Sequence, residues 1–315
     1  MSLDEISEET SKILQSVDGA VVADEEFLKT VLTGFAARGH VLIEDVPGTG
    51  KTLAARSFAK SMGLTFNRIQ FTPDLLPSDI TGSHIYNKDT NSFEFNKGPI
   101  FANVVLADEI NRAPPKTQAA LLEAMGEKQV SVDNETRELP EPFFVIATQN
   151  PVEQEGTFAL PEAQRDRFMV KTKMGYPSRS GERLILDARA DRSSRMPEAS
   201  QVVNEVEVKR IQEGVESVEV AESVRDYIVD ICRSTRSDER VDVGVSPRGI
   251  QRLFEASRAK ALVESRSFVV PEDVKSITEP VLKHRLVLTP DAEVDDVGKE
   301  EVVRSVVESV DVPEA

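Results

Sequence analysis

The chain of 315 residues has no tryptophan, one cysteine and three histidines, and these scarcities exclude several kinds of site. Aromatic residues make up only 5% of the chain, so stacked aromatic platforms for nucleic-acid bases are not expected. Because Cys232 stands alone, disulfide bonds and multi-thiolate metal sites within the chain are excluded. His40, His84 and His284 lie far apart and lack the spacing of metal ligands, so we expect each to be structural or exposed.

Long apolar runs and basic clusters are also missing. No 18 apolar residues follow one another, and the acidic N-terminus lacks the apolar stretch of a signal peptide, so we expect a cytoplasmic protein without a membrane span. The net charge is −17, and only 15 of the 38 basic residues are lysine. This balance disfavours a nucleic-acid groove. It is typical of adaptation to high salt, and a very soluble mesophilic protein is the alternative.

A glycine-rich segment, Gly48-Thr49-Gly50-Lys51-Thr52, follows the apolar run at residues 41–43. Such a turn between a strand and a helix directs backbone N–H groups inward, where they can hold phosphates at the helix N-terminus. Lys51 is expected to neutralise β- and γ-phosphate oxygens, and the Thr52 hydroxyl to bind Mg2+. The general pattern G-x-x-x-x-G-K-[ST] has glycine where this chain has Asp45. Taken alone, the segment also fits a surface turn before a helix.

A second apolar run, residues 103–107, ends in Asp108 and Glu109. In open α/β sheets, ligands bind at the carboxyl edge of the strands. There Asp108 fits a partner of Mg2+, and Glu109 fits the base that orients an attacking water. Asn150 follows the strand predicted at 143–147 and reaches the same edge, where its amide can bind the γ-phosphate or the water. The alternative for Asp108 and Glu109 is an ordinary strand end.

Strand and helix signals alternate through residue 172 and predict an α/β fold with a doubly wound parallel sheet. Two short helices are expected between residues 4 and 37, with breaks at residues 18–19 and at Gly34, and the segment 73–79 is expected to open another short helix. Hairpins are expected at 84–96 and 129–139. From Pro177 onward the helix signals dominate, which predicts a second, mostly helical part. We place the domains at 1–177 and 178–315, the latter ending in an acidic tail.

Three arginines stand where an anion would stabilise them. Ser246 and Pro247 are typical of a helix start, and Arg248 in the first turn faces the positive end of the helix dipole. We expect Arg248 to reach a bound γ-phosphate from the helical part, a solvated arginine being the alternative. Arg165 and Arg167 are expected near the active-site edge, where one could act as an arginine finger. A surface ion pair with the intervening Asp166 is the alternative.

This ordered set of motifs resembles the MoxR family of AAA+ ATPases. The most specific stretch is residues 106–125, LADEINRAPPKTQAALLEAM, supported by LPEAQ at 160–164 and SPR at 246–248. The resemblance runs from about Val21 to the C-terminal segment and implies a P-loop core followed by a helical lid. It implies Walker A at 45–52, Walker B at 104–109, sensor 1 at Asn150 and sensor 2 at Arg248. By the same resemblance, Arg167 is preferred to Arg165 as the finger.

The resemblance also implies ATP and Mg2+ as cofactors, hexameric rings and chaperone-like work on a protein client or adaptor, often with a von Willebrand A domain. Insertions at about 78–99 and 129–139 would face a central pore, with ordinary surface hairpins as the alternative. A chelatase-type motor subunit, a DNA-acting motor and a nucleotide-gated scaffold remain alternative functions, the DNA motor being disfavoured by the net charge. The chain departs from the family pattern at Asp45, at Ala23 in place of glycine, and at Arg165 in place of an apolar residue.

The predicted site therefore has three groups of residues. The catalytic residues are Glu109, Asn150, Arg167, Arg165 and Arg248. The metal ligands are Thr52 and Asp108. The nucleotide-binding residues are Val46, Pro47, Gly48, Thr49, Gly50, Lys51, Thr52 and Leu53, together with Val21 and Val22 beside the adenine, for which a plain core contact is the alternative.

Overall fold

The computed structural model describes residues 3–133, 135–151, 156–190 and 198–313. The helices in these ranges are α1 (Leu3–Asp18), α2 (Glu25–Ala36), α3 (Lys51–Ser61), α4 (Pro77–Thr81), α5 (Pro115–Glu127), α6 (Glu162–Arg165), α7 (Arg179–Ala190), α8 (Glu205–Gly214), α9 (Glu222–Ser234), α10 (Pro247–Val263), α11 (Pro271–Leu282), α12 (Pro290–Val294) and α13 (Lys299–Ser309), with 3-10 turns η1 (Ile110–Arg112), η2 (Val215–Ser217) and η3 (Lys283–Arg285). The strands are β1 (Val41–Glu44), β2 (Phe66–Gln70), β3 (Gly82–Asn87), β4 (Ser92–Lys97), β5 (Val104–Asp108), β6 (Gln129–Val132), β7 (Glu135–Glu138), β8 (Phe144–Gln149), β9 (Val170–Thr172), β10 (Val241–Val243) and β11 (Val287–Leu288).

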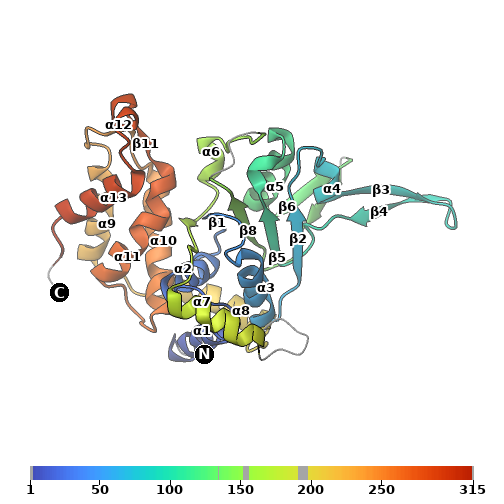
Figure 1. Ribbon diagram of the computed structural model, residues 1–315, viewed down its shortest axis with the longest axis horizontal. Coiled ribbons are helices and arrows are strands. Elements are labelled where there is room, and N and C mark those ends of the chain that lie inside the picture. The colour runs from blue at the N-terminus through green and yellow to red at the C-terminus, as the bar shows by residue number, and fades with distance from the viewer. Residues whose placement is uncertain (1–2, 134, 152–155, 191–197, 314–315) are drawn as a thin grey trace.

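A five-stranded sheet in the order β2-β5-β8-β1-β9 forms the centre of the molecule, and its neighbouring strands are all parallel (Figure 1). Parallel strands require crossover connections, and α3 lies on the connection from β1 to β2 and α5 on that from β5 to β8. The predicted α/β fold with a parallel sheet is confirmed. Within the described residues, no helix is both long enough and apolar enough to cross a membrane.

Both faces of this sheet are buried. Alternate residues of a strand point to opposite faces, and on β1, β5 and β8 they belong to two separate apolar clusters. Val41 and Ile43 pack with α1, α2 and α3, whereas Leu42 packs with Leu121 and Leu122 of α5. Helices on both faces therefore leave the carboxyl edge of the strands as the open side for a ligand.

Helix α2 passes through Gly34, where we expected a break, and ends at Ala36. A Cβ on Gly34 would lie 2.9 Å from Val41 Cγ2 and 3.2 Å from Val170 Cγ2. The glycine thus marks a close approach of α2 to the sheet rather than a helix end. The short helix expected to open within residues 73–79 is α4, which begins at Pro77.

Two hairpins form where the sequence predicts them. The β3–β4 hairpin projects from the body of the molecule (Figure 1) and exposes Ile85, Tyr86 and Phe93. The shorter β6–β7 hairpin packs against it, with the Arg137 guanidinium 4.0 Å from the centre of the Phe95 ring. Asn134 in the predicted turn of β6–β7 lies outside the described residues.

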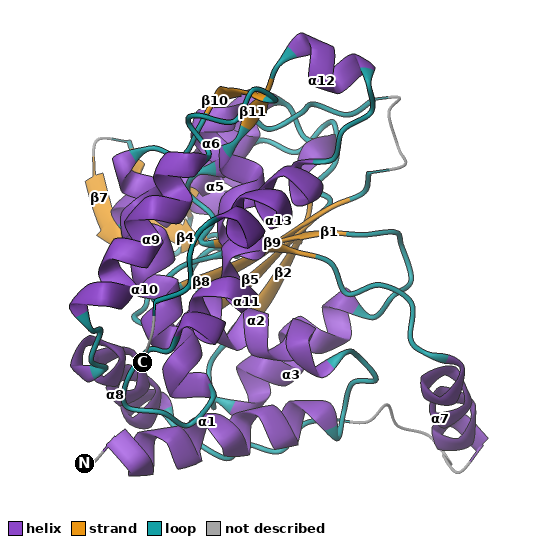
Figure 2. Cartoon of the chain, turned by 90° about the vertical axis from the view of Figure 1, so that its left-hand side faces the viewer, coloured by secondary structure: helices purple, strands orange, loops and turns teal. Residues whose placement is uncertain are grey.

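The helical part expected after residue 177 is present. Helices α9 to α13 lie together on one side of the sheet (Figure 1), whereas α7 lies apart from them (Figure 2). Helix α10 packs against α2, and the buried Lys260 Nζ pairs with Glu26 of α2 at 2.6 Å. The segment expected as an acidic tail contains α12 and α13, and Val302, Val303 and Val306 of α13 are buried.

Candidate functional site

The predicted phosphate loop connects β1 to α3 at the carboxyl edge of the sheet. Gly48 and Gly50 have positive φ angles of 86° and 102°, and Gly50 is the N-cap of α3. Glycine adopts these angles without the steric cost of a side chain. Asp45, which stands in place of the first loop glycine, does not have a positive φ angle. The loop therefore does not need a glycine's conformational freedom at this position.

Lys51 begins α3 and folds back over the loop. Its Nζ donates to the carbonyl oxygens of Val46, at 2.6 Å, and Asp45, at 3.0 Å. Burial lowers the pKa of Lys51, and the negative charges of Asp45, Asp108 and Glu109 oppose that shift. The loop lysine and the two carboxylates predicted from the second motif therefore share one electrostatic environment.

Register explains this convergence. Glu44, the last residue of β1, lies opposite Gln149 of β8, and Gln70 of β2 lies opposite Asp108 of β5. The loops that follow these strands consequently meet at one edge. The buried Asn150 comes directly after β8, so the structure brings this residue to the same edge as the phosphate loop.

Thr148 on β8 holds both predicted carboxylate residues. Its hydroxyl donates to Asp108 Oδ1 at 2.6 Å and accepts from the backbone N–H of Glu109 at 2.8 Å. The other oxygen, Asp108 Oδ2, accepts from Arg68 Nε at 3.1 Å and Nη2 at 2.6 Å. Asp108 is thus fixed from two neighbouring strands.

Glu109 has a left-handed backbone with φ 57°, a conformation that is uncommon for a non-glycine residue. Its Oε2 accepts from Gln70 Nε2 at 2.8 Å and lies 3.1 Å from Arg112 Nε. The carboxylate is thus held between Gln70 of β2 and Arg112 of η1.

The predicted magnesium residues supply hard oxygen atoms, the donors that Mg2+ prefers. Thr52 lies in the first turn of α3, and Asp108 is buried at the end of β5. Since both Asp108 oxygens already accept hydrogen bonds, they suit contact with Mg2+ through a water molecule, and Mg2+ usually keeps several waters. In the described ranges, this edge included, no group of three or more His, Cys, Asp or Glu side chains is arranged to hold a metal.

The residues predicted to lie beside the adenine are at the connection between α1 and α2. Val21 is buried, and Val22 is partly buried. Val22 Cγ1 would be 2.9 Å from a Cβ on Gly181, so the start of α7 packs directly against this connection.

The three predicted arginines have different partners. Arg165 pairs with Glu162 of its own helix at 3.1 Å, and Arg167 donates to the backbone carbonyl of Leu122 in α5. Arg248, whose side chain is 60% exposed, lies 3.5 Å from Asp166. Ser246 caps α10 as predicted, accepting from the N–H of Gly249. The alternative of a surface ion pair between Asp166 and Arg165 or Arg167 is not seen among the described residues, where Arg165 pairs with Glu162 and Asp166 with Arg248 and Arg285.

Asp166 pairs instead with Arg285, which the sequence analysis missed. Arg285 Nε lies 2.8 Å from Asp166 Oδ1, and its Nη2 donates to the Phe168 carbonyl at 2.8 Å. The Arg285 side chain is only 3% exposed, and burial lowers its pKa to about 10. This buried arginine fastens the helical part to the segment that carries both finger candidates.

Other missed residues had weak sequence signals. Arg68 and Gln70 are polar positions in the edge strand β2, and Thr148 is a polar position at the end of the buried strand β8. A polar residue near the carboxyl end of a strand is the available signal, but their partners depend on strand order.

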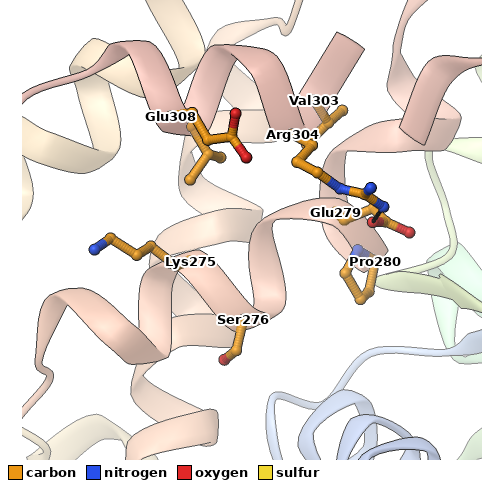
Figure 3. Close-up of a pocket in the computed structure, with 8 residues that line it drawn as sticks. Lys275, Ser276, Glu279, Pro280, Val303, Arg304 and Glu308 are labelled. Carbon is orange, nitrogen blue, oxygen red and sulfur yellow. Dashed lines mark ion pairs between the residues drawn. The ribbon is translucent and has the colours of Figure 1, made fainter. Parts of the chain in front are cut away.

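A cavity of about 340 Å³ lies between α11 and α13 in the helical part (Figure 3). Lys275 and Glu279 of α11 and Arg304 of α13 are among its lining residues. None of the lining residues belongs to the predicted site, so the cavity is separate from the phosphate loop.

Comparison with known proteins gives matches in both parts of the chain. Residues 40–170 match the ATPase family associated with various cellular activities (AAA), and residues 233–306 match the AAA lid domain. The chain is 43% identical over 303 residues to chaperone MoxR1 of Mycobacterium tuberculosis, covering 93% of this chain and 80% of that protein. It is 32% identical over 299 residues to protein MoxR of Paracoccus denitrificans, covering 87% of each.

A relative and a solved structure extend these similarities. The uncharacterized protein YeaC of Bacillus subtilis is 46% identical over 302 residues, covering 96% of this chain and 94% of that protein. A candidate ATPase from Cytophaga hutchinsonii has a structure that matches with a TM-score of 0.91 at 37% identity, covering 98% of this chain and 96% of that chain.

Proposed function

The chain belongs to the MoxR family of AAA+ ATPases, and from that premise we propose that it binds ATP with Mg2+ and hydrolyses it to drive chaperone-like remodelling or maturation of a protein partner. The observation that carries the proposal is the convergence of Lys51, Asp108 and Glu109 at one sheet edge. A cation for phosphates, a carboxylate for the metal and a base for water are the parts that ATP hydrolysis needs.

In this proposal, the loop N–H groups and Lys51 bind the triphosphate. Lys51 gives up its bonds to the carbonyls of Asp45 and Val46 and turns to the β- and γ-phosphate oxygens. Mg2+, held through Thr52 and Asp108, supplies charge neutralisation of the β- and γ-phosphates.

Glu109 acts as the base that orients the attacking water. For that role its carboxylate must leave Gln70 and Arg112, so these two contacts oppose hydrolysis in the conformation described here. Asn150 supplies an amide at the same edge for the γ-phosphate or the water. Arg248 turns from Asp166 to the γ-phosphate, which links the angle of the lid to the nucleotide.

The active assembly is proposed to be a hexameric ring in which Arg167, or else Arg165, reaches the nucleotide of the neighbouring subunit. The name of the MoxR1 relative supports chaperone-like work on a client. An adaptor or client with a von Willebrand A domain, a cytoplasmic location and a high-salt working environment complete the proposal. The last rests on the net charge of −17.

The experiment that tests the proposal is the Glu109→Gln variant. We expect its ATP dissociation constant to stay near the wild-type value while phosphate release falls by about 10² to 10⁴-fold, because only the base is lost. Glu123→Gln is the matched control, since this exposed carboxylate of α5 lies outside the predicted site. Normal turnover in Glu109→Gln would remove Glu109 as the base.

The Glu109→Gln variant also tests whether the protein acts on a protein client. A protein that copurifies with Glu109→Gln in ATP, dissociates in ADP and is not retained by Lys51→Ala would support remodelling of a partner. Stimulation of phosphate release by DNA at the working salt concentration, without such a partner, would instead favour a DNA-acting motor.

A further inference from the structure

The carboxylate of Asp45 joins the phosphate loop to a segment almost 130 residues later in the chain. Asp45 is 8% exposed. Its Oδ1 accepts from the N–H of Val46 at 2.8 Å, and its Oδ2 accepts from the N–H groups of Met174 at 3.0 Å and Gly175 at 2.6 Å. Three backbone N–H groups therefore solvate one buried charge.

Met174 and Gly175 belong to the connector, residues 173–178, which runs from β9 to α7. The connector also touches the loop through an apolar contact, because Met174 Cε is 3.3 Å from the position of a Cβ on Gly50. Beyond the connector, the start of α7 packs on Val22, as described above. The phosphate loop, the connector and the connection between α1 and α2 thus form one continuous set of contacts.

The phosphate loop itself has no need of this carboxylate. The general motif has glycine at this position, and the loop N–H groups that face phosphates come from later residues. A negative charge beside a triphosphate is also electrostatically unfavourable. A glycine at position 45 would lose the bond from Val46 within the loop and the two bonds from the connector, and only the latter two reach beyond the loop.

We propose that Asp45 is a positioning residue that holds the connector against the phosphate loop, so that the connector, Val22 and the start of α7 form the wall that binds the adenosine part of ATP. The inference rests on the proposed function and adds a determinant of nucleotide selectivity. A residue of this kind affects binding of the nucleoside while leaving the polyphosphate contacts in place.

The test compares two ligands, ATP and inorganic tripolyphosphate, both with Mg2+, by calorimetry on the full chain. In Asp45→Asn, whose amide keeps one acceptor oxygen, and in Asp45→Gly, we expect the preference for ATP over tripolyphosphate to fall by about tenfold, equivalent to about 1.4 kcal/mol. Tripolyphosphate itself should bind as in the wild type or more tightly. A purely structural loss would weaken both ligands together.

Glu44→Gln is the matched control, because it removes the same charge one residue earlier and Glu44 pairs with Lys171 of β9 rather than with the connector. This control should keep the wild-type preference. If ATP and tripolyphosphate change in parallel in both Asp45 variants, the inference is wrong although the wild type still hydrolyses ATP. If the wild-type chain binds no ATP, the proposed function fails and the inference fails with it.

Discussion

At the scale of single residues, His40 illustrates how burial sets a charge state. Its Nδ1 accepts from the N–H of Val145 at 3.1 Å, and its Nε2 lies 3.2 Å from the Met125 carbonyl oxygen, so the neutral ring with a proton on Nε2 satisfies both bonds. Burial lowers the pKa of His40 to about 4. The folded chain therefore favours the neutral ring, as expected of a structural histidine.

This histidine predicts a loss of stability in acid. Between pH 6.5 and about 4, the His40 ring is protonated in the unfolded chain but neutral in the folded chain. The free energy of unfolding therefore falls as the pH falls through this window. When the pH is lowered from 7.5 to 5, we expect the free energy of unfolding, measured in urea, to fall by about 2 kcal/mol less in His40→Gln than in the wild type. An equal loss in both proteins would contradict the assignment. His284, whose pKa burial also lowers, stays in both.

Individual residues also show where sequence reasoning ends. Lys51, Asp108 and Asn150 follow local motifs, and such motifs can be recognised without a fold. The partners of Asp45, Arg68 and Arg285 lie 40 or more positions away. Those contacts depend on strand order and on the packing of the lid, which no local pattern encodes.

At the scale of elements, the contact of η3 with the segment after α6 depends on Arg285. Its guanidinium donates to the carbonyls of Phe168, Met169 and Val281 in addition to Asp166. A buried arginine with this many acceptors is costly to remove, because the acceptors and the carboxylate lose their partner together.

We therefore expect Arg285→Ala to lower the free energy of unfolding by about 3 kcal/mol or more. Arg285→Lys keeps the charge but not the planar fork of donors, so its free energy of unfolding should lie between those of Arg285→Ala and the wild type. Arg304→Ala is the control, because Arg304 is 68% exposed and lies 3.8 Å from Glu279. Denaturant unfolding measures all three, and similar values for Arg285→Ala and Arg304→Ala would refute the assigned role.

Elements with strong local patterns were predicted well. Both hairpins follow from alternating residues around polar turns, and α10 follows from its Ser246 cap and Pro247. Gly34 was misinterpreted because a glycine that permits close packing and a glycine that ends a helix look alike in sequence. Only the neighbouring strands β1 and β9 distinguish the two cases.

At the scale of the whole molecule, a finger acting between subunits predicts complementation. Arg167→Ala should lower ATP hydrolysis by about 10³ to 10⁵-fold, and Glu109→Gln should lower it for a different reason, the loss of the proposed base. In mixed rings, the Glu109→Gln subunit offers its arginine to the intact site of its neighbour, so phosphate release should recover. A mixture of Glu109→Gln with Lys51→Ala serves as the control, because neither chain has an intact site of its own.

Absence of recovery would place Arg167 outside the neighbouring site. Recovery with Arg165→Ala in its place would assign the finger to Arg165. The division into domains at residue 177 and the central pore stay predictions of the same scale, because a single chain does not contain the interface between subunits.

The Asp166 carboxylate contacts two arginines of the lid, Arg248 and Arg285, and this arrangement bears on how the lid could move. Arg285 is buried and Arg248 is largely exposed, so a γ-phosphate that attracts Arg248 leaves the Asp166–Arg285 pair in place. In the proposed movement of Arg248 toward a γ-phosphate, the lid would therefore move least at Arg285 and most at Arg248. Because Asp166 lies between Arg165 and Arg167, the two candidate fingers, rotation of the lid in the proposed ring would also act on the site of the adjacent subunit.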